Sequence, residues 1–358
     1  MSATASITNT DRLNYLNIGL ILISCIVAFM VPFELFLFSY AVLGPLHYLT
    51  EISWLHERNY FSKKKTDFIF LTIAGLILFM LVYITPDLNI IKGKEDTYYT
   101  STIVVYVAFI ASLAMVVLKD TFQRFIAFII ICASAFVSKS AFLLFSVFMP
   151  TLIHVFLFTG LFMLYGALKG RSRSGYLSCI IFFLVPFVFI YYNPDSLPWS
   201  DYAYTHYQKF WIVNFETIKL FDISSVMPAS TMSGVLAKTV FTTNTGMIVM
   251  RFIAFAYTYH YLNWFSKTTV IKWHQVPKKR LIAIGVLWIA SVAFYVYKYE
   301  LGFNVLFLLS FLHVFLEFPL NHVTIIGIFK EAGDIMRGKK TPVPVKGNVK
   351  AIVKGKKN

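Results

Sequence analysis

Apolar runs of about 20 residues recur along the whole 358-residue chain, and this repetition constrains the fold more than any other feature. A helix of that length crosses a hydrocarbon core of about 30 Å. Only 14% of the residues are charged, whereas an ordinary soluble domain carries about 25%. The sequence therefore excludes a soluble globular protein and predicts an all-α, polytopic integral membrane helical bundle.

We expect ten helical spans, with boundaries uncertain by several residues. They cover about 13–31, 33–55, 67–86, 100–118, 125–137, 141–168, 176–192, 246–266, 281–297 and 303–328. The fifth is short and Pro150 interrupts the sixth, so these two are candidates for a re-entrant pair, which leaves about eight to ten transmembrane helices. They form a single transmembrane domain over 1–337, in which the aromatic segment 193–245 lies at the outer interface.

Basic residues are distributed unevenly between the two sets of loops. One set, with both termini, holds 24 of the 32 lysines and arginines, against seven in the other set, with Arg251 left inside a span. The positive-inside rule then predicts cytoplasmic termini in a cytoplasmic (inner) membrane. The net charge of +15 reflects this topology and a disordered basic tail over 338–358, which we expect to meet anionic lipid and not nucleic acid.

One motif, L-H-x3-E-x4-H, occurs twice, starting at Leu46 and at Leu312. Ionisable residues within membrane spans are costly and mark functional sites by default. Residues four apart lie on one face of a helix, so each copy can present an imidazole and a carboxylate to one point. The last histidine of each copy lies about 180° around the helix and is a weaker ligand candidate. The motif residues are His47, Glu51, His56, His313, Glu317 and His322.

Two further histidines, His154 and His260, also lie within spans. Counted from the outer ends at 33, 141, 246 and 303, His47, His154, His260 and Glu317 are each 13 or 14 residues deep, roughly 20 Å at 1.5 Å per residue. Four helices thus deliver imidazole or carboxylate to one level. Tyrosines and an asparagine close in sequence to these histidines are candidates for side chains that hydrogen-bond and orient the ligands: Tyr48, Tyr257, Tyr261 and Asn263.

Imidazole and carboxylate without thiolate suit Fe(II), Zn(II), Mn(II) or Cu(II), and the mixture with open positions is typical of non-haem iron. We therefore predict a centre of one or two Fe2+ ions, with O2 as co-substrate. A buried iron site has direct access to lipids, quinones, sterols and carotenoids, which need activated oxygen. The prediction is an oxidoreductase, of the oxygenase or dioxygenase kind, whose partners are membrane lipids, a lipophilic substrate and an electron donor.

The segment Gly44-Pro45-Leu46-His47, with an acid four residues later and histidines on later helices, resembles the bacterial Brp/Blh family of membrane carotene-cleaving dioxygenases. The resemblance implies one iron held by histidines, oxygen as co-substrate and a long polyene substrate. Only His47, His154, His260 and His313 carry over. The chain lacks the H-x3-H, H-x2-H-H and H-H clusters of membrane fatty acid hydroxylases and desaturases.

Two other classes of protein place histidines inside the membrane. A haem protein needs histidine pairs but no neighbouring glutamates, so the two H-x3-E pairs favour non-haem metal. A proton-coupled transporter relays protons through histidine and glutamate and requires no metal, which makes it the main alternative. The two motif-bearing helices run in the same direction by this topology and give no sign of an inverted repeat.

Overall fold

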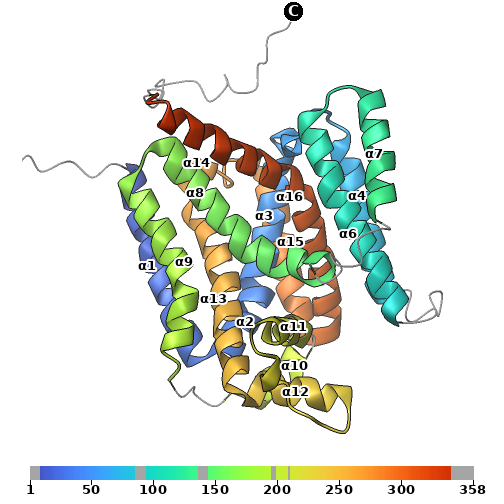
Figure 1. Cartoon of the computed structure of the whole chain (residues 1–358), viewed down its shortest axis with the longest axis vertical. Helices are drawn as coiled ribbons and strands as arrows, with labels where there is room; N and C mark the ends of the chain where they lie inside the picture. The colour runs from blue at the N-terminus through green and yellow to red at the C-terminus, as the bar shows by residue number, and fades with distance from the viewer. Residues whose placement is uncertain (1–8, 85–93, 136–143, 195–198, 209, 340–358) are drawn as a thin grey trace, which may run out of the picture.

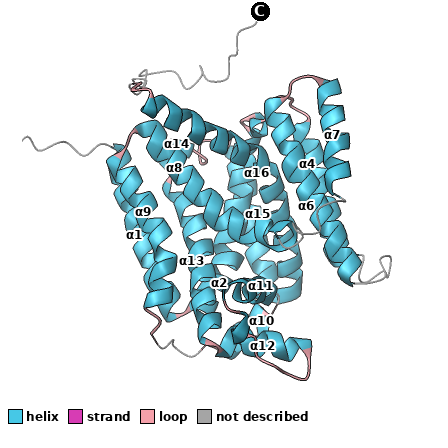
Figure 2. Ribbon diagram, in the orientation of Figure 1, coloured by secondary structure: helices cyan, strands magenta, loops and turns pink. Residues whose placement is uncertain are grey.

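The computed structural model describes residues 9–84, 94–135, 144–194, 199–208 and 210–339. All regular structure within these ranges is helical, as the predicted all-α class requires (Figure 2). The basic tail beyond Lys339 lies outside the described residues, as does the connection between the fifth and sixth predicted spans.

Each of the ten predicted spans contains a helix. The α-helices are α1 Asn9–Met30, α2 Pro32–Phe38, α3 Gly44–His56, α4 Asp67–Phe79, α6 Lys94–Val117, α7 Thr121–Ala135, α8 Thr159–Gly170, α9 Arg173–Tyr191, α10 Asp201–Tyr207, α11 Trp211–Phe221, α12 Met232–Thr242, α13 Asn244–Ser266, α14 Thr268–Ile271, α15 Lys278–Tyr297 and α16 Tyr299–Met336. Three π-helical segments, η1 Ser39–Leu43, η3 Met80–Ile84 and η5 Leu144–Phe158, and two 3-10 turns, η2 Asn59–Phe61 and η6 Ile223–Ser225, join them.

The lengths of these helices fit an integral membrane protein. In the described part of the chain, seven helical stretches are long and apolar enough to cross a bilayer, and α12 with α13 makes an eighth that is bent by 77°. Two shorter apolar helices, over Asp67–Val82 and Thr121–Ala135, complete the set. The chain is therefore a polytopic helical membrane protein.

The helices form a central bundle with an adjoining layer on one side (Figure 1). In the bundle α13 packs on α1 and α2, while α16 contacts α3, α8 and α15; α4, α6 and α7 form the layer beside α16. Helices α10, α11 and α12, here called the cap, cover one end. The start of α1 and the end of α16 lie at the opposite end, here called the termini face (Figure 1).

The ionisable motif residues lie on the most enclosed helices. Most of α13 is buried over its whole circumference, as are α3 and the middle of α16. By contrast, α7 and α15 bury only a few residues and expose large apolar side chains such as Phe122 and Ile282, as lipid-facing helices do. The layout separates a lipid-facing shell from an interior in which polar groups are held away from water.

Two of the candidate ligands follow or lie in π-helical backbone. Segment η1 directly precedes α3, and His154 lies inside η5 together with Pro150. We predicted that Pro150 interrupts the sixth span, and the helix there is π-helical until Phe158, where α8 continues it. π-Helical turns widen the helix and occur frequently at functional sites.

Candidate metal centre

Four histidines from four helical segments meet in the centre of the bundle: His47 of α3, His154 of η5, His260 of α13 and His313 of α16. All four are buried, with exposed fractions of 1%, 2%, 7% and 2%. Neighbouring ring centroids lie 4.6 Å apart for His47 and His260, 5.0 Å for His260 and His154, 4.8 Å for His154 and His313, and 5.3 Å for His313 and His47. The imidazoles therefore form a closed ring of four.

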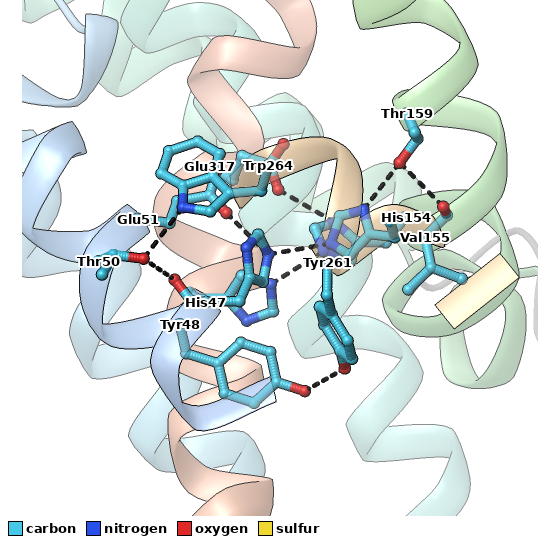
Figure 3. A network of polar contacts seen from close by, with 12 residues as sticks. His47, Tyr48, Thr50, Glu51, His154, Val155, Thr159, Tyr261, Trp264 and Glu317 are labelled. Atoms are coloured by element: carbon cyan, nitrogen blue, oxygen red, sulfur yellow. Dashed lines mark hydrogen bonds and ion pairs between the residues drawn. The ribbon is translucent and has the colours of Figure 1, made fainter. Parts of the chain in front are cut away.

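The Nε2 atoms of this ring point inward. His47 Nε2 lies 3.0 Å from His260 Nε2, and His154 Nε2 lies 2.9 Å from His313 Nε2 (Figure 3). Two metal–nitrogen bonds of about 2.1 Å at a right angle place their nitrogens roughly 3.0 Å apart. The spacing thus matches nitrogens that share one coordination sphere.

In His260 and His313, the hydrogen bond of the outer nitrogen, Nδ1, determines which ring nitrogen carries the proton. Thr159 donates its hydroxyl hydrogen to the Val155 carbonyl at 2.9 Å, so its oxygen accepts from His260 Nδ1 at 2.7 Å. His313 Nδ1 donates to the Ser310 carbonyl at 2.6 Å, because a carbonyl can only accept. In the neutral rings His260 Nε2 and His313 Nε2 then carry no hydrogen and present lone pairs to the centre. Metal-binding histidines are typically held this way.

Two carboxylates approach the ring. Glu51 Oε2 lies 3.1 Å from His47 Nε2, and Glu317 Oε2 lies 3.1 Å from His154 Nδ1. These distances suit ion pairs, but their angles do not suit hydrogen bonds, and both buried oxygens lack a hydrogen-bond partner, as does His154 Nδ1. A buried carboxylate without hydrogen bonds is costly in a membrane interior.

The donor set therefore fits a metal ion, which would compensate these buried oxygens. Two overlapping groups of ligand atoms lie within 4.8 Å of one another, one of His47, His260 and His313 and the other of His154, His313 and Glu317. Because His313 belongs to both groups, the candidates make one continuous centre. The two groups together hold five donors, the four imidazoles and the carboxylate of Glu317, while Glu51 adjoins His47 but belongs to neither group.

The two sides of the imidazole ring differ. Glu51 and Glu317 lie on one side and Tyr48 and Tyr261 on the other (Figure 3). Tyr48 stacks on His313 with a centroid distance of 4.3 Å, and its hydroxyl lies 2.7 Å from that of Tyr261. A side chain on Gly44 would lie 3.1 Å from the Tyr48 hydroxyl, which places this hydroxyl one turn before His47, toward the cap. The carboxylate side faces the termini.

Four other predicted site residues lie around this centre without joining a converging ligand group among the described residues. His56 is exposed and its Nδ1 lies 3.4 Å from the Tyr60 hydroxyl. His322 is buried and donates from Nε2 to the Phe109 carbonyl at 2.9 Å. Tyr257 packs 6.3 Å from Tyr261, and Asn263 is buried with an Oδ1 that has no hydrogen-bond partner.

The structure adds contacts that the sequence analysis missed. Thr159 orients His260, and Trp264 donates from Nε1 to Thr50 Oγ1 at 3.0 Å while its ring lies 5.4 Å from His47. No spacing rule links Thr159 to His260, which lies 101 residues further along the chain. Trp264 is four residues after His260, so helical periodicity alone could have identified it as a neighbour.

Comparisons of the chain with protein-family models, with characterised proteins and with solved structures each find no match. The resemblance to the Brp/Blh dioxygenases therefore remains a prediction that rests on a short segment and on the histidines. The fold and the geometry of the centre carry the functional argument.

Proposed function

We propose that this protein is a membrane-embedded oxygenase that uses non-haem iron to oxidise a lipophilic molecule drawn from the bilayer. The observation that carries the proposal is the ring of four buried imidazoles with Nε2 inward, together with the carboxylates of Glu317 and Glu51 beside it. Imidazole and carboxylate donors without thiolate are typical of non-haem iron. We expect one or two iron ions per chain, because the donors form two overlapping groups that share His313.

His47, His154, His260, His313 and Glu317 would hold the iron, with Glu51 beside His47. When bound, it would supply the activation of O2 that an unreactive hydrocarbon substrate needs. The protein's own contribution is orientation: Thr159 and the Ser310 carbonyl hold protons on the outer nitrogens of two rings. Glu317 lies against His154, and the surrounding apolar helices keep water out. The hydroxyls of Tyr48 and Tyr261 are hydrogen-bonding groups on the cap side.

The substrate class follows from the place of the site. The centre lies between two clusters of buried apolar side chains in a bundle whose outer helices face lipid. A carotenoid or lipid reaches such a site laterally and offers few reactive groups other than C–H and C=C bonds. The resemblance to carotene-cleaving dioxygenases favours a long polyene. The basic loops favour a cytoplasmic membrane with the termini face in the cytoplasm.

The two rival functions make different demands on the same geometry. The axial nitrogens of a bis-histidine haem lie on opposite sides of the iron, about 4 Å apart for two bonds of about 2.1 Å. The Nε2 pairs here, at 3.0 and 2.9 Å, leave no room for a haem between them. A proton-coupled transporter would use the His47–Glu51 and His154–Glu317 contacts as a relay without metal. Metal content separates it from an oxygenase.

The test is elemental analysis of detergent-solubilised protein purified anaerobically with iron, with an absorption spectrum of the same sample. We expect near-stoichiometric iron without a Soret band, and little metal in His47→Ala and His313→Ala. His56→Ala and His322→Ala are matched controls from the same two motifs, and we expect them to keep the metal. Full metal content in both folded variants, His47→Ala and His313→Ala, would show that these histidines do not hold the metal and would overturn the proposed centre. A wild-type protein without metal would favour the transporter.

A further inference from the structure

A pair of tryptophans connects the candidate centre to the termini face. The ring of Trp264 lies 5.4 Å from His47, and the ring of Trp54 lies 5.5 Å from Trp264, both contacts being edge to face. Trp264 is buried and Trp54 is half-buried. Among the described residues this is the one ring contact between two tryptophans. It begins at a ligand and ends where the bundle meets solvent.

Hydrogen bonds hold both indoles in place. Trp264 donates from Nε1 to Thr50 Oγ1 at 3.0 Å, and Thr50 donates to the carbonyls of Leu46 and His47 at 2.7 and 3.0 Å. Trp264 is thus fixed to the turn of α3 that carries His47. Trp54 donates from Nε1 to the Ile271 carbonyl at 2.9 Å. Neither indole can swing away from the line between the centre and the surface without losing a hydrogen bond.

The outer end of the pair is surrounded by positive charge. The guanidinium of Arg58 lies 4.2 Å from the centroid of the Trp54 ring. Lys272 follows the residue that accepts the Trp54 hydrogen bond, and Arg280 pairs with Glu57 at the end of α3. We call Arg58, Lys272, Lys278, Lys279 and Arg280 the basic rim. Glu57 is the acid placed against this rim in the described structure, and Arg280 already neutralises it.

We propose that Trp54 and Trp264 carry electrons to the metal centre from a negatively charged one-electron carrier that docks on the basic rim. This inference rests on the proposed function, since it needs a redox-active metal. The carrier, a reduced iron–sulfur or flavin protein, loses one electron, and a ferric centre becomes ferrous. No bond forms or breaks and no proton moves. Opposite charges on carrier and rim steer the encounter.

The route has a physical rationale beyond proximity. Electron tunnelling slows exponentially with distance, and a π system that bridges the gap between carrier and metal accelerates it. Each indole acts as such a bridge without changing its own oxidation state, and its N–H bond to Thr50 or Ile271 holds the ring in the path. Phenylalanine has a smaller ring and no N–H to fix it. Positive charge in these loops also serves topology, so docking needs its own measurement.

The test injects electrons at a known point. In a Cys132→Ser background, Lys272→Cys carries a ruthenium photosensitiser, and loss of the ferric absorption after a flash gives the injection rate. We expect Trp264→Phe to slow injection by at least an order of magnitude. Trp288→Phe is the matched control, because its Nε1 bonds the Val42 carbonyl away from this path. A label at exposed Lys298→Cys, on the cap side, should inject more slowly than the label at Lys272→Cys.

Each outcome decides the route separately from the oxygenase. If the purified protein holds no iron, Cu(II), which imidazoles bind well, serves as the electron acceptor in the same experiment. Equal rates in Trp264→Phe and Trp288→Phe, with metal bound, would overturn the route, as would loss of metal from Trp264→Phe. Binding of an acidic plant-type ferredoxin to the metal-free protein tests the rim: we expect Lys272→Glu with Lys278→Glu to abolish it, and unchanged binding would overturn the docking site.

Discussion

The two copies of the L-H-x3-E motif are identical in spacing and different in what they contact. In α3, Glu51 lies beside the inward Nε2 of its own histidine, His47. In α16, Glu317 lies beside the outward Nδ1 of His154, which comes from another helix. Glu317 converges with His154 and His313, whereas Glu51 adjoins His47 alone and joins neither group of converging ligand atoms.

The residue three positions before each histidine shows the same difference. In α16 this residue is Ser310, whose carbonyl accepts from His313 Nδ1 and fixes that ring from within its own helix. In α3 it is Gly44, and His47 Nδ1 is buried without a hydrogen-bond partner. His47 thus depends on Glu51 and on the other rings for its orientation. A shared spacing sets which face a side chain occupies, and the neighbouring helices set its role.

The largest expected effect comes from the two glutamates. Loss of a partner outside the ligand set typically lowers metal affinity by roughly 10–100-fold. We expect Glu51→Gln to fall within that range and Glu317→Gln to exceed it, because only Glu317 belongs to a converging group of ligand atoms. Anaerobic equilibrium dialysis against Fe2+ measures both affinities. Equal losses of Fe2+ affinity would mean that the two glutamates contribute equally to metal binding and that the two motif copies have the same role.

Helical periodicity predicted the all-α fold, and it singled out the four histidines that the structure brings together along with His56 and His322, which lie apart from them. Apolar runs long enough to cross a bilayer have few alternatives to a helix, because every backbone group must be satisfied within the chain. Equal depth along four helices brought His47, His154 and His260 to one level with the α16 motif. Within the described residues a sharp bend of 77° joins α12 and α13 at Thr243, which caps α13 by accepting from the Gly246 amide. The re-entrant pair expected from the fifth and sixth spans stays a prediction, because the connection between them lies outside the described residues.

Spacing could not assign the contacts of individual nitrogens. Glu317 is four residues from His313, yet its close contact is with His154, because tertiary packing decides which neighbour fills the space beside a carboxylate. Thr159 was missed for a related reason. It follows a π-helical segment, in which the 3.6-residue count from His154 no longer gives direction, and its partner His260 is on a distant helix.

A smaller loss of metal affinity is expected from substitution of Thr159. Its hydroxyl orients the ring of His260, which belongs to neither copy of the motif. Thr159→Val keeps the shape of the side chain and removes the acceptor of His260 Nδ1. We expect an affinity loss at the lower end of the range for partners outside the ligand set, about 10-fold. Thr50→Val is the matched control, since Thr50 bonds Trp264 and no ligand ring. Dialysis with Fe2+ should separate the two, and equal losses would assign the effect to general loosening of the bundle.

The smallest effect is expected at Gly44, which stands three positions before His47, where the α16 copy has Ser310. A methyl group there would lie 3.1 Å from the Tyr48 hydroxyl and 3.4 Å from that of Tyr261, so the pair must shift. Alanine in a helix is worth roughly 0.5–1 kcal/mol over glycine, and we expect this crowding to cancel that gain in Gly44→Ala. Gly166→Ala, with nothing within 4 Å, should show the full gain in denaturation midpoint. If Gly44→Ala stabilises the protein as much as Gly166→Ala, the Tyr48–Tyr261 contact can shift without cost. The absence of a side chain at Gly44 would then not be what allows Tyr48 to stack on the His313 ring.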